Sequence, residues 1–256
     1  MTALSVNLNK VATIRNTRAL GIPSVLKAAK ICLQAGAHGI TVHPRPDERH
    51  IRPSDVHDLS ELLKDRPGVE FNIEGNPFHN LMGFVRSFKP DQVTFVPDDQ
   101  TQSTSDHGWR FPEDLKRLGP VIKEALDLGV RVSLFMDAEP AQMPFVKELG
   151  AQRVELYTEP YASAFGAPEQ NAVLEKFRLA AQSATDAGLQ INAGHDLNLH
   201  NLGLLIQTIP LIREVSIGHA LIADALESGY SATVKAYLSC IQNAHSALSD
   251  LPSSVK

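Results

Sequence analysis

The chain has 256 residues, of which 43% are hydrophobic and 21% charged, the composition of a soluble globular protein with a sizeable core. Its formal net charge of −5 argues against a general binder of nucleic acid or of acidic membranes, because either needs a dominant basic surface. The two cysteines, Cys32 and Cys240, lack metal-ligand spacing, and the N-terminus lacks a signal-peptide pattern. No segment approaches membrane-spanning length, so we expect a cytoplasmic protein.

A helix-then-strand pattern repeats along the chain. An amphipathic stretch ends at a glycine, which suits the left-handed conformation that closes a helix, and a short β-branched run follows. We interpret these strands as largely apolar rather than alternating, as expected of a parallel sheet covered on both faces. The glycines that end the helical stretches are Gly36, Gly129, Gly150 and Gly188. The predicted strands span residues 4–9, 39–43, 69–74, 92–96, 131–136, 153–157, 189–192 and 214–217.

Helical segments separate the strands. Strict alternation implies a parallel sheet with right-handed crossovers, and eight units in this length favour an α/β fold of the (β/α)8 TIM barrel type. No composition break divides the chain, so residues 1–256 are expected to form one domain. Two connections, 97–111 and 158–168, are candidate lids or binding loops, with a plain surface excursion as the alternative. The clearest helical segments span 24–35, 54–64, 78–88, 113–128 and 169–187.

Polar residues stand at the ends of the predicted strands, where barrels of this kind carry their chemistry. His43 ends the second strand, and His195 and His219 each follow a glycine at the end of a later strand. Glu74 lies in an otherwise apolar strand and must find a partner or shift its pKa, with a structural ion pair as the alternative reading. Because these residues stand at the same rim of the predicted barrel, we expect them to form one site. The strand period also places polar pairs on one face, Asn7 with Asn9, Asn72 with Glu74, and Glu155 with Tyr157.

Basic residues follow the second strand in the segment HPRPDERHIR. Guanidinium groups bind phosphate bidentately and an imidazole adds a hydrogen bond, so Arg45 and His50 are candidate phosphate ligands. For Arg49 and Arg52, pairing with neighbouring acidic residues is favoured. Arg18, after the first strand, is a further candidate for phosphate binding.

A second phosphate signal comes from Gly218, which precedes a predicted helix beginning near His219. A glycine lets a ligand approach backbone N–H groups, and a helix N-terminus adds partial positive charge. The sequence has no P-loop, dinucleotide-binding or zinc-protease motif. Lys10 either forms an imine with a carbonyl substrate or supplies a charge that holds a phosphate or carboxylate.

Seven stretches, spread from the first predicted strand to the eighth, together resemble the pyridoxine 5′-phosphate synthase family of vitamin B6 biosynthesis. They read SVNLNKVATIRNTR, AGAHGITVHPRPDERHI, FNIEG, TFVPD, VSLFMDA, NAGHDLNLHN and SIGHALI. The resemblance implies a (β/α)8 barrel with additional helices, no metal or organic cofactor, and a homo-octamer. It implies condensation of 3-amino-2-oxopropyl phosphate with 1-deoxy-D-xylulose 5-phosphate to give pyridoxine 5′-phosphate, phosphate and water.

The resemblance also assigns roles to residues that match the family's motifs. His43 and Glu74 are expected to be proton acceptors, and His195 a proton donor. The residues expected to hold the amino-ketone phosphate are Asn7, Arg18, Asp196, Gly218 and His219. Those expected to hold the deoxyxylulose phosphate are Asn9, Lys10, Arg45, His50 and Thr104.

The implied chemistry accounts for these residue types. The substrate amine and ketone form an imine with each other, so no enzyme lysine is required. Ring closure needs proton transfers by groups poised near neutral pH, and burial in an apolar strand would raise the pKa of Glu74 toward that range. The two phosphates anchor the substrates, and closure of the 97–111 loop would exclude water from reactive imines.

The sequence departs from the best-known family members at two places. Asn9-Lys10 stands where they have Asp-His, and Asp196 replaces a glycine after His195. The first change keeps hydrogen-bonding capacity and a cation, whereas the second adds a carboxylate near a phosphate. The alternatives are another phosphate-binding barrel enzyme, either an aldolase with its imine on Lys10 or a sugar-phosphate epimerase, and a non-catalytic barrel that binds a phosphorylated metabolite.

Overall fold

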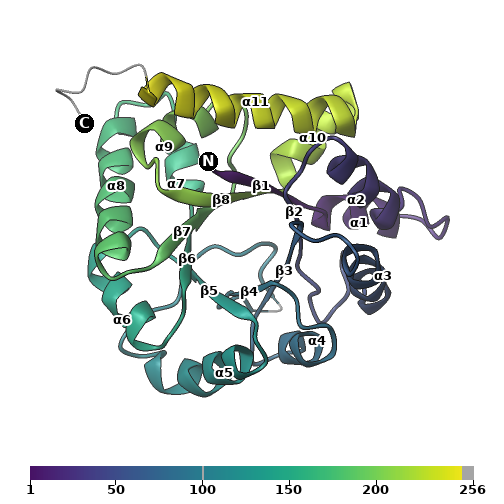
Figure 1. Ribbon diagram of the computed structural model, residues 1–256, viewed down its shortest axis with the longest axis horizontal. Helices are drawn as coiled ribbons and strands as arrows, with labels where there is room; N and C mark the ends of the chain where they lie inside the picture. Colours follow the sequence, from purple (N-terminus) through teal and green to yellow (C-terminus); the bar gives the residue numbers. More distant parts are fainter. Residues whose placement is uncertain (100, 250–256) are drawn as a thin grey trace.

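The computed structural model describes residues 1–99 and 101–249. Within these residues eight parallel strands close into a barrel in chain order, and the first strand pairs with both the second and the eighth. Figure 1 shows the helices arranged around the strands. The predicted (β/α)8 TIM barrel with additional helices is therefore confirmed.

The strands lie close to their predicted positions. Only the fifth has the predicted bounds, and the first ends two residues earlier than predicted, so Asn9 begins a helix instead. The Asn7 side-chain oxygen accepts the backbone N–H of Asn9 at 3.0 Å, which turns the chain out of the strand. The strands are Ala3–Asn7 (β1), Gly39–Val42 (β2), Glu70–Gly75 (β3), Gln92–Phe95 (β4), Arg131–Met136 (β5), Arg153–Leu156 (β6), Gln190–Ala193 (β7) and Ile212–Ile217 (β8).

The helices surround the barrel. The 158–168 connection, predicted as a loop, contains a short helix, α7, with a proline in its first turn. The last helix, α11, packs against α2, α9 and α10. The helices are α1 (Asn9–Asn16), α2 (Val25–Gln34), α3 (Pro53–Leu63), α4 (Leu81–Phe88), α5 (Leu115–Asp127), η1 (Pro140–Gln142), α6 (Met143–Glu148), α7 (Glu159–Ala164), α8 (Gln170–Asp186), α9 (Leu202–Thr208), α10 (His219–Ser228) and α11 (Tyr230–Ser249).

The strands alternate in polarity, contrary to the sequence interpretation. Apolar residues such as Val6 and Ile73 belong to the core that packs with the helices. The residues between them are polar and meet inside the barrel, where Ser5 and Thr41 hydroxyls lie 2.7 Å apart and Thr94 donates to Asn72 at 3.2 Å. The barrel interior is therefore a polar layer inside an apolar shell.

A buried arginine organises this layer at the amino ends of the strands. Arg153 donates through one guanidinium nitrogen to Gln92 at 3.0 Å and pairs with Glu70 and Glu214, each at 3.3 Å. Burial, together with the charge of Glu70, raises the pKa of Glu214 well above its ordinary value. Such a buried cation needs partners of this kind, because an unpaired one would be strongly destabilising.

The 97–111 connection is anchored at its second half. The Trp109 ring N–H donates to the carbonyl of Phe95 at 2.8 Å, and the Trp109 side chain is 1% exposed. The backbone N–H of Trp109 donates to the carbonyl of Phe135 at 3.0 Å, and that of Gly108 donates to the Asp137 carboxylate at 3.0 Å. These contacts fix Gly108 and Trp109 beside the carboxyl ends of β4 and β5. Among the described residues, no helix is long and apolar enough to cross a membrane.

We expect Trp109→Phe to lower the free energy of unfolding by about 1–3 kcal/mol, because the carbonyl of Phe95 loses a buried donor while an aromatic ring is kept. Urea unfolding followed by circular dichroism measures the change. An unchanged unfolding midpoint would show that the ring packing alone anchors the connection.

Candidate active site

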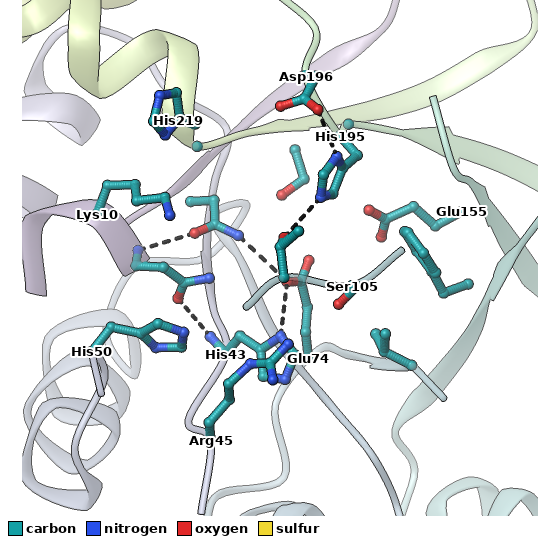
Figure 2. A pocket seen from close by; sticks show the side chains of 18 of the residues that line it. Lys10, His43, Arg45, His50, Glu74, Ser105, Glu155, His195, Asp196 and His219 are labelled. Carbon is teal, nitrogen blue, oxygen red and sulfur yellow. Dashed lines mark hydrogen bonds and ion pairs between the residues drawn. The ribbon is translucent and has the colours of Figure 1, made fainter. Parts of the chain in front are cut away.

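A cavity of about 310 Å³ opens at the carboxyl ends of the strands, within the size range of small-molecule sites. Figure 2 shows side chains from widely separated strands and loops pointing into it. The cavity brings together every predicted site residue except Arg18. The predicted residues that line it are Asn7, Asn9, Lys10, His43, Arg45, His50, Glu74, Thr104, His195, Asp196, Gly218 and His219.

Arg18 lies outside this lining. It is exposed in the segment that follows α1, near Leu20 and Ile22, which are each 65% exposed. Its predicted role in phosphate binding stays a prediction. Arg15, three residues earlier in the chain, has a structural role instead: it forms a buried ion pair with Asp55 and donates to the carbonyl of His50 at 3.0 Å.

His43 lies between two carboxyl groups. Its Nε2 is 3.2 Å from the Asp98 carboxylate, and its Nδ1 is 4.0 Å from Glu74. Burial alone would raise the pKa of Asp98, but the hydrogen bond from His43 and the positive charges of His43 and Arg45 outweigh it and lower that pKa. Asp98 is therefore an ionised partner that orients the imidazole. Sequence reasoning missed it, because Asp98 stands in a run of polar residues without periodicity.

Glu74 is the central carboxyl group of the cavity. Burial raises its pKa well above the ordinary value of 4.5, and the charges of Glu155, Glu214 and Asp98 add to the effect. The Asn7 side-chain amide donates to it at 3.4 Å. Beside this weak hydrogen bond and the more distant His43 imidazole, Glu74 binds a proton more readily than an exposed glutamate, which suits a proton acceptor.

Glu155 is a second buried carboxyl group that the sequence placed on a shared face but not in the site. Burial raises its pKa to about 7, opposed by the nearby His195 and by a hydrogen bond with Thr94. One of its oxygens has no hydrogen-bond partner among the described residues. Glu155 also lines the cavity and joins the acid–base groups there.

Arg45 connects the β2 end to the 97–111 connection. Its guanidinium pairs with Asp98 at 2.6 Å and donates to the carbonyls of Asp99 and Gln102 at 3.2 and 3.1 Å. The same connection reaches across the cavity, where the Thr104 hydroxyl lies 3.0 Å from Nε2 of His195. Arg49 pairs with Asp47 at 2.6 Å, as the favoured interpretation of that residue required.

His50 is a neutral imidazole. Burial and the charges of His43, Arg45, Lys10 and Arg49 lower its pKa to about 3. The backbone N–H of Ile51 donates to its Nδ1 at 3.0 Å, so the ring hydrogen of the neutral form is on Nε2. A neutral ring in this tautomer offers one N–H donor to an anionic oxygen in the cavity.

The β1 end and the helix after it fix the neighbouring wall. The Asn9 side-chain oxygen accepts the backbone N–H of His43 at 2.9 Å, so the amide performs a structural task that needs no carboxylate. Lys10, next in the chain, lines the cavity and adds a cation there. The Asn9-Lys10 pair therefore retains both an acceptor and a positive charge.

The β8 end meets the start of α10 at Gly218. A Cβ at this position would come within 3.2 Å of the Asn7 side chain, so the backbone approaches β1 closely. The first N–H groups of α10, from His219 onward, lie beside the cavity lining and lack partners within the helix. Partial positive charge at this helix end suits an anion.

The β7 end is equally constrained. A Cβ at Gly194 would clash with the backbone oxygen of Ser216 on β8, which fixes the loop that carries His195. The Thr158 hydroxyl donates to the carbonyl of His195 at 2.6 Å. The glycine-histidine pairs after β7 and β8 thus serve one cavity. No group of three or more histidine, cysteine, aspartate or glutamate residues in the described chain is placed to hold a metal ion.

Comparison with known proteins decides the family. The family described as "Pyridoxal phosphate biosynthesis protein PdxJ" matches residues 4–243. The chain belongs to this family. The pyridoxine 5′-phosphate synthase of Albidiferax ferrireducens is 62% identical over 250 residues, which are 96% of this chain and 99% of that protein. The synthase of Xanthomonas axonopodis pv. citri is 50% identical and covers 95% of this chain and 98% of its own.

Solved structures resemble the chain in fold alone. One titled "Native KDPGal structure" has a TM-score of 0.62 at 12% identity and covers 95% of this chain and 96% of its own. Phosphoribosyl anthranilate isomerase from Thermus thermophilus has a TM-score of 0.56 at 15% identity and covers 94% and 99%. Because their sequence identities are low, these barrels show a shared fold only. They do not favour the alternative functions over the one that the PdxJ family match supports.

We expect Glu155→Gln to become more stable relative to the parent as pH rises from about 4.5 to 7. In the parent, unfolded Glu155 loses its proton near 4.5 whereas folded Glu155 keeps it to about 7, so the parent's free energy of unfolding falls across this window by on the order of 2–3 kcal/mol. Glutamine has no such proton. Urea unfolding of both proteins at pH 5 and pH 8 measures the difference, and an equal difference at both pH values would contradict the raised pKa.

Proposed function

We infer that this chain is a pyridoxine 5′-phosphate synthase, which condenses 3-amino-2-oxopropyl phosphate with 1-deoxy-D-xylulose 5-phosphate. The products are pyridoxine 5′-phosphate, inorganic phosphate and water. In a chain of this family, the observation that carries the inference is the convergence of His43, Glu74 and His195 from three different strand ends on one cavity. The reaction needs several proton transfers at one place, and this cavity supplies groups suited to them.

Two sides of the cavity suit the two phosphates. The start of α10 at Gly218 and His219, with the Asn7 amide nearby, would hold the phosphate of the amino ketone. Arg45 and the neutral His50, with Lys10, Asn9 and Thr104, would hold the deoxyxylulose phosphate. Holding both anions fixes the amine of one substrate against the ketone of the other, which replaces much of the entropy cost of their encounter.

The acid–base groups would then act on the imine that the substrates form with each other. His43, held by Asp98, and Glu74 accept protons from substrate carbons or hydroxyls, and His195 returns a proton to the departing oxygen. Arg18 remains a proposed contact to the amino-ketone phosphate, and Asp196 to the same phosphate through its backbone. No enzyme imine enters this scheme, so Lys10 acts as a cation.

We propose that the enzyme is cytoplasmic and assembles as a homo-octamer. Apolar side chains remain on its surface, including Leu20 and Ile22, each 65% exposed, and Leu226, which is 72% exposed. Covering such side chains between subunits would remove apolar area from water. Sedimentation velocity on the purified chain distinguishes an octamer from a monomer.

We expect the purified protein, given both phosphorylated substrates in buffer with a metal chelator and no nucleotide, to form pyridoxine 5′-phosphate and release inorganic phosphate. Mass spectrometry identifies the organic product, and a colorimetric assay follows phosphate. Folded protein that binds both substrates without forming the product would instead indicate the non-catalytic barrel. Conversion of the sugar phosphate to an epimer, seen only after a metal is restored, would indicate the epimerase class.

We expect Glu74→Gln to fold like the parent but to lose at least about a hundredfold in kcat, because glutamine keeps the shape and cannot exchange a proton. Glu148→Gln, an exposed change on α6, is the matched control and should keep the parent rate. Near-normal turnover in Glu74→Gln would remove this residue from the proton-accepting role.

A further inference from the structure

The residue after His195 has an uncommon backbone conformation. Asp196 has a φ of 61°, in the left-handed region that L-residues other than glycine, asparagine and aspartate rarely adopt. The surrounding loop enforces it. Asn201, which is 1% exposed, donates to the carbonyl of Asp196 at 3.2 Å, and Leu197 beside it is fully buried. A side chain kept at such a position in a cavity wall calls for a functional reason.

The Asp196 side chain turns back onto the histidine before it. Its carboxylate Oδ2 lies 3.1 Å from Nδ1 of His195. A dashed line marks this contact in Figure 2. An ionised carboxylate only accepts hydrogen bonds, so this contact requires the hydrogen of the imidazole to be on Nδ1. The other ring nitrogen, Nε2, faces the cavity and lies 3.0 Å from the Thr104 hydroxyl.

Other groups determine whether Asp196 is ionised. The hydrogen bond from His195 lowers the pKa of Asp196 against the opposing effect of burial, and the charges of His195, His219 and Lys10 lower it further. The carboxylate therefore stays charged at neutral pH beside His195. Lys10 and His219 come from α1 and α10, so basic side chains from two other elements support the ionised form of Asp196.

The remaining neighbours of His195 come from β6 and the residue after it. Glu155 interacts with it electrostatically across the cavity, and the Tyr157 ring packs edge-on with its centroid 5.1 Å from that of the imidazole. Burial raises the pKa of Tyr157 to about 12, so this ring is neutral at working pH. The Asp196 carboxylate contacts Nδ1 of the His195 ring, and the Thr104 hydroxyl contacts Nε2.

We propose that Asp196 is a positioning residue whose carboxylate holds His195 with its hydrogen on Nδ1 and presents Nε2 to the substrate. When the ring takes up a proton, Nε2 becomes the donor, and the charge of Asp196 stabilises the imidazolium that gives the proton away. After transfer, the neutral ring returns to the same tautomer and orientation. The strained backbone at Asp196 is the means by which a residue adjacent to His195 reaches its Nδ1.

Two substitutions separate the effect of the Asp196 charge from the effect of its backbone conformation. Asp196→Asn tolerates the left-handed conformation and keeps an acceptor but removes the charge, whereas Asp196→Gly also relaxes the backbone. Glu159→Gln is the matched control, because Glu159 is a carboxylate near Tyr157 that hydrogen-bonds Ser163 and has no contact with the His195 ring among the described residues. All three proteins are compared with the parent as full-length chains.

The first measurement does not depend on turnover. Nitrogen-15 NMR of histidine-labelled protein, with the His195 signals identified by their loss in His195→Gln, reports the tautomer and the pH midpoint of ring protonation. We expect Nδ1–H in the parent, and a midpoint lower by about one pH unit in both Asp196 variants but not in Glu159→Gln. An unchanged midpoint in Asp196→Asn, or an Nε2–H ring in the parent, would overturn the proposal.

The second measurement rests on the proposed function. At a pH above both midpoints, a shift of one unit lowers the protonated fraction of His195 about tenfold, so we expect kcat of Asp196→Asn and Asp196→Gly to fall about tenfold while KM changes little. Parent turnover in Asp196→Asn, or a loss confined to Asp196→Gly, would overturn the role in catalysis. If the parent itself forms no pyridoxine 5′-phosphate, the proposed function fails, whereas the NMR result still decides the positioning of His195.

Discussion

The desolvation of carboxyl groups inside the barrel is the constraint on which the rest of the site depends. Glu74 and Glu155 project from β3 and β6 into the barrel interior, where burial limits the water that can stabilise their charge, and burial is the largest cause of their raised pKa values. Asp98, buried nearby but hydrogen-bonded to His43 and paired with Arg45, has a lowered pKa instead. Similar carboxyl groups are thereby divided into proton carriers and fixed anions by their surroundings alone.

Fixed backbone at the rim gives these groups their geometry. The β7 and β8 ends approach so closely that a side chain at Gly194 would clash with Ser216, and Gly218 packs against Asn7 on β1. The side chains proposed to transfer protons thus sit on strands or within two residues of their ends, and proton transfer requires such precise placement. The 97–111 connection, anchored at Trp109, adds Thr104 to this frame from outside the barrel.

The fold could be predicted from the sequence because its signals are local. Parts of the site could not be predicted in this way. Glycines ending helices and β-branched runs after them require only neighbouring residues, and they located all eight strands. The inward polar face was misread because strands of four to six residues show too few alternations. The pKa of Glu155 depends on His195 and Thr94, which are distant in sequence. Asp98 pairs with His43, but nothing in its local sequence distinguishes it from its polar neighbours. Arg18 was assigned from its place after the first strand and from the family motif, and neither carries a distance to the cavity.

Burial of these carboxyl groups also resolves an electrostatic conflict. A chain with a net charge of −5 would repel two phosphorylated substrates if every acidic group near its cavity were ionised. Raised pKa values lessen the negative charge of Glu74 and Glu155, whereas ionised Asp98 and Asp196 are each hydrogen-bonded to a histidine. Lys10 and the start of α10 then face the anions with little competing charge. The desolvation that prepares the proton carriers therefore also makes the cavity acceptable to its anionic substrates.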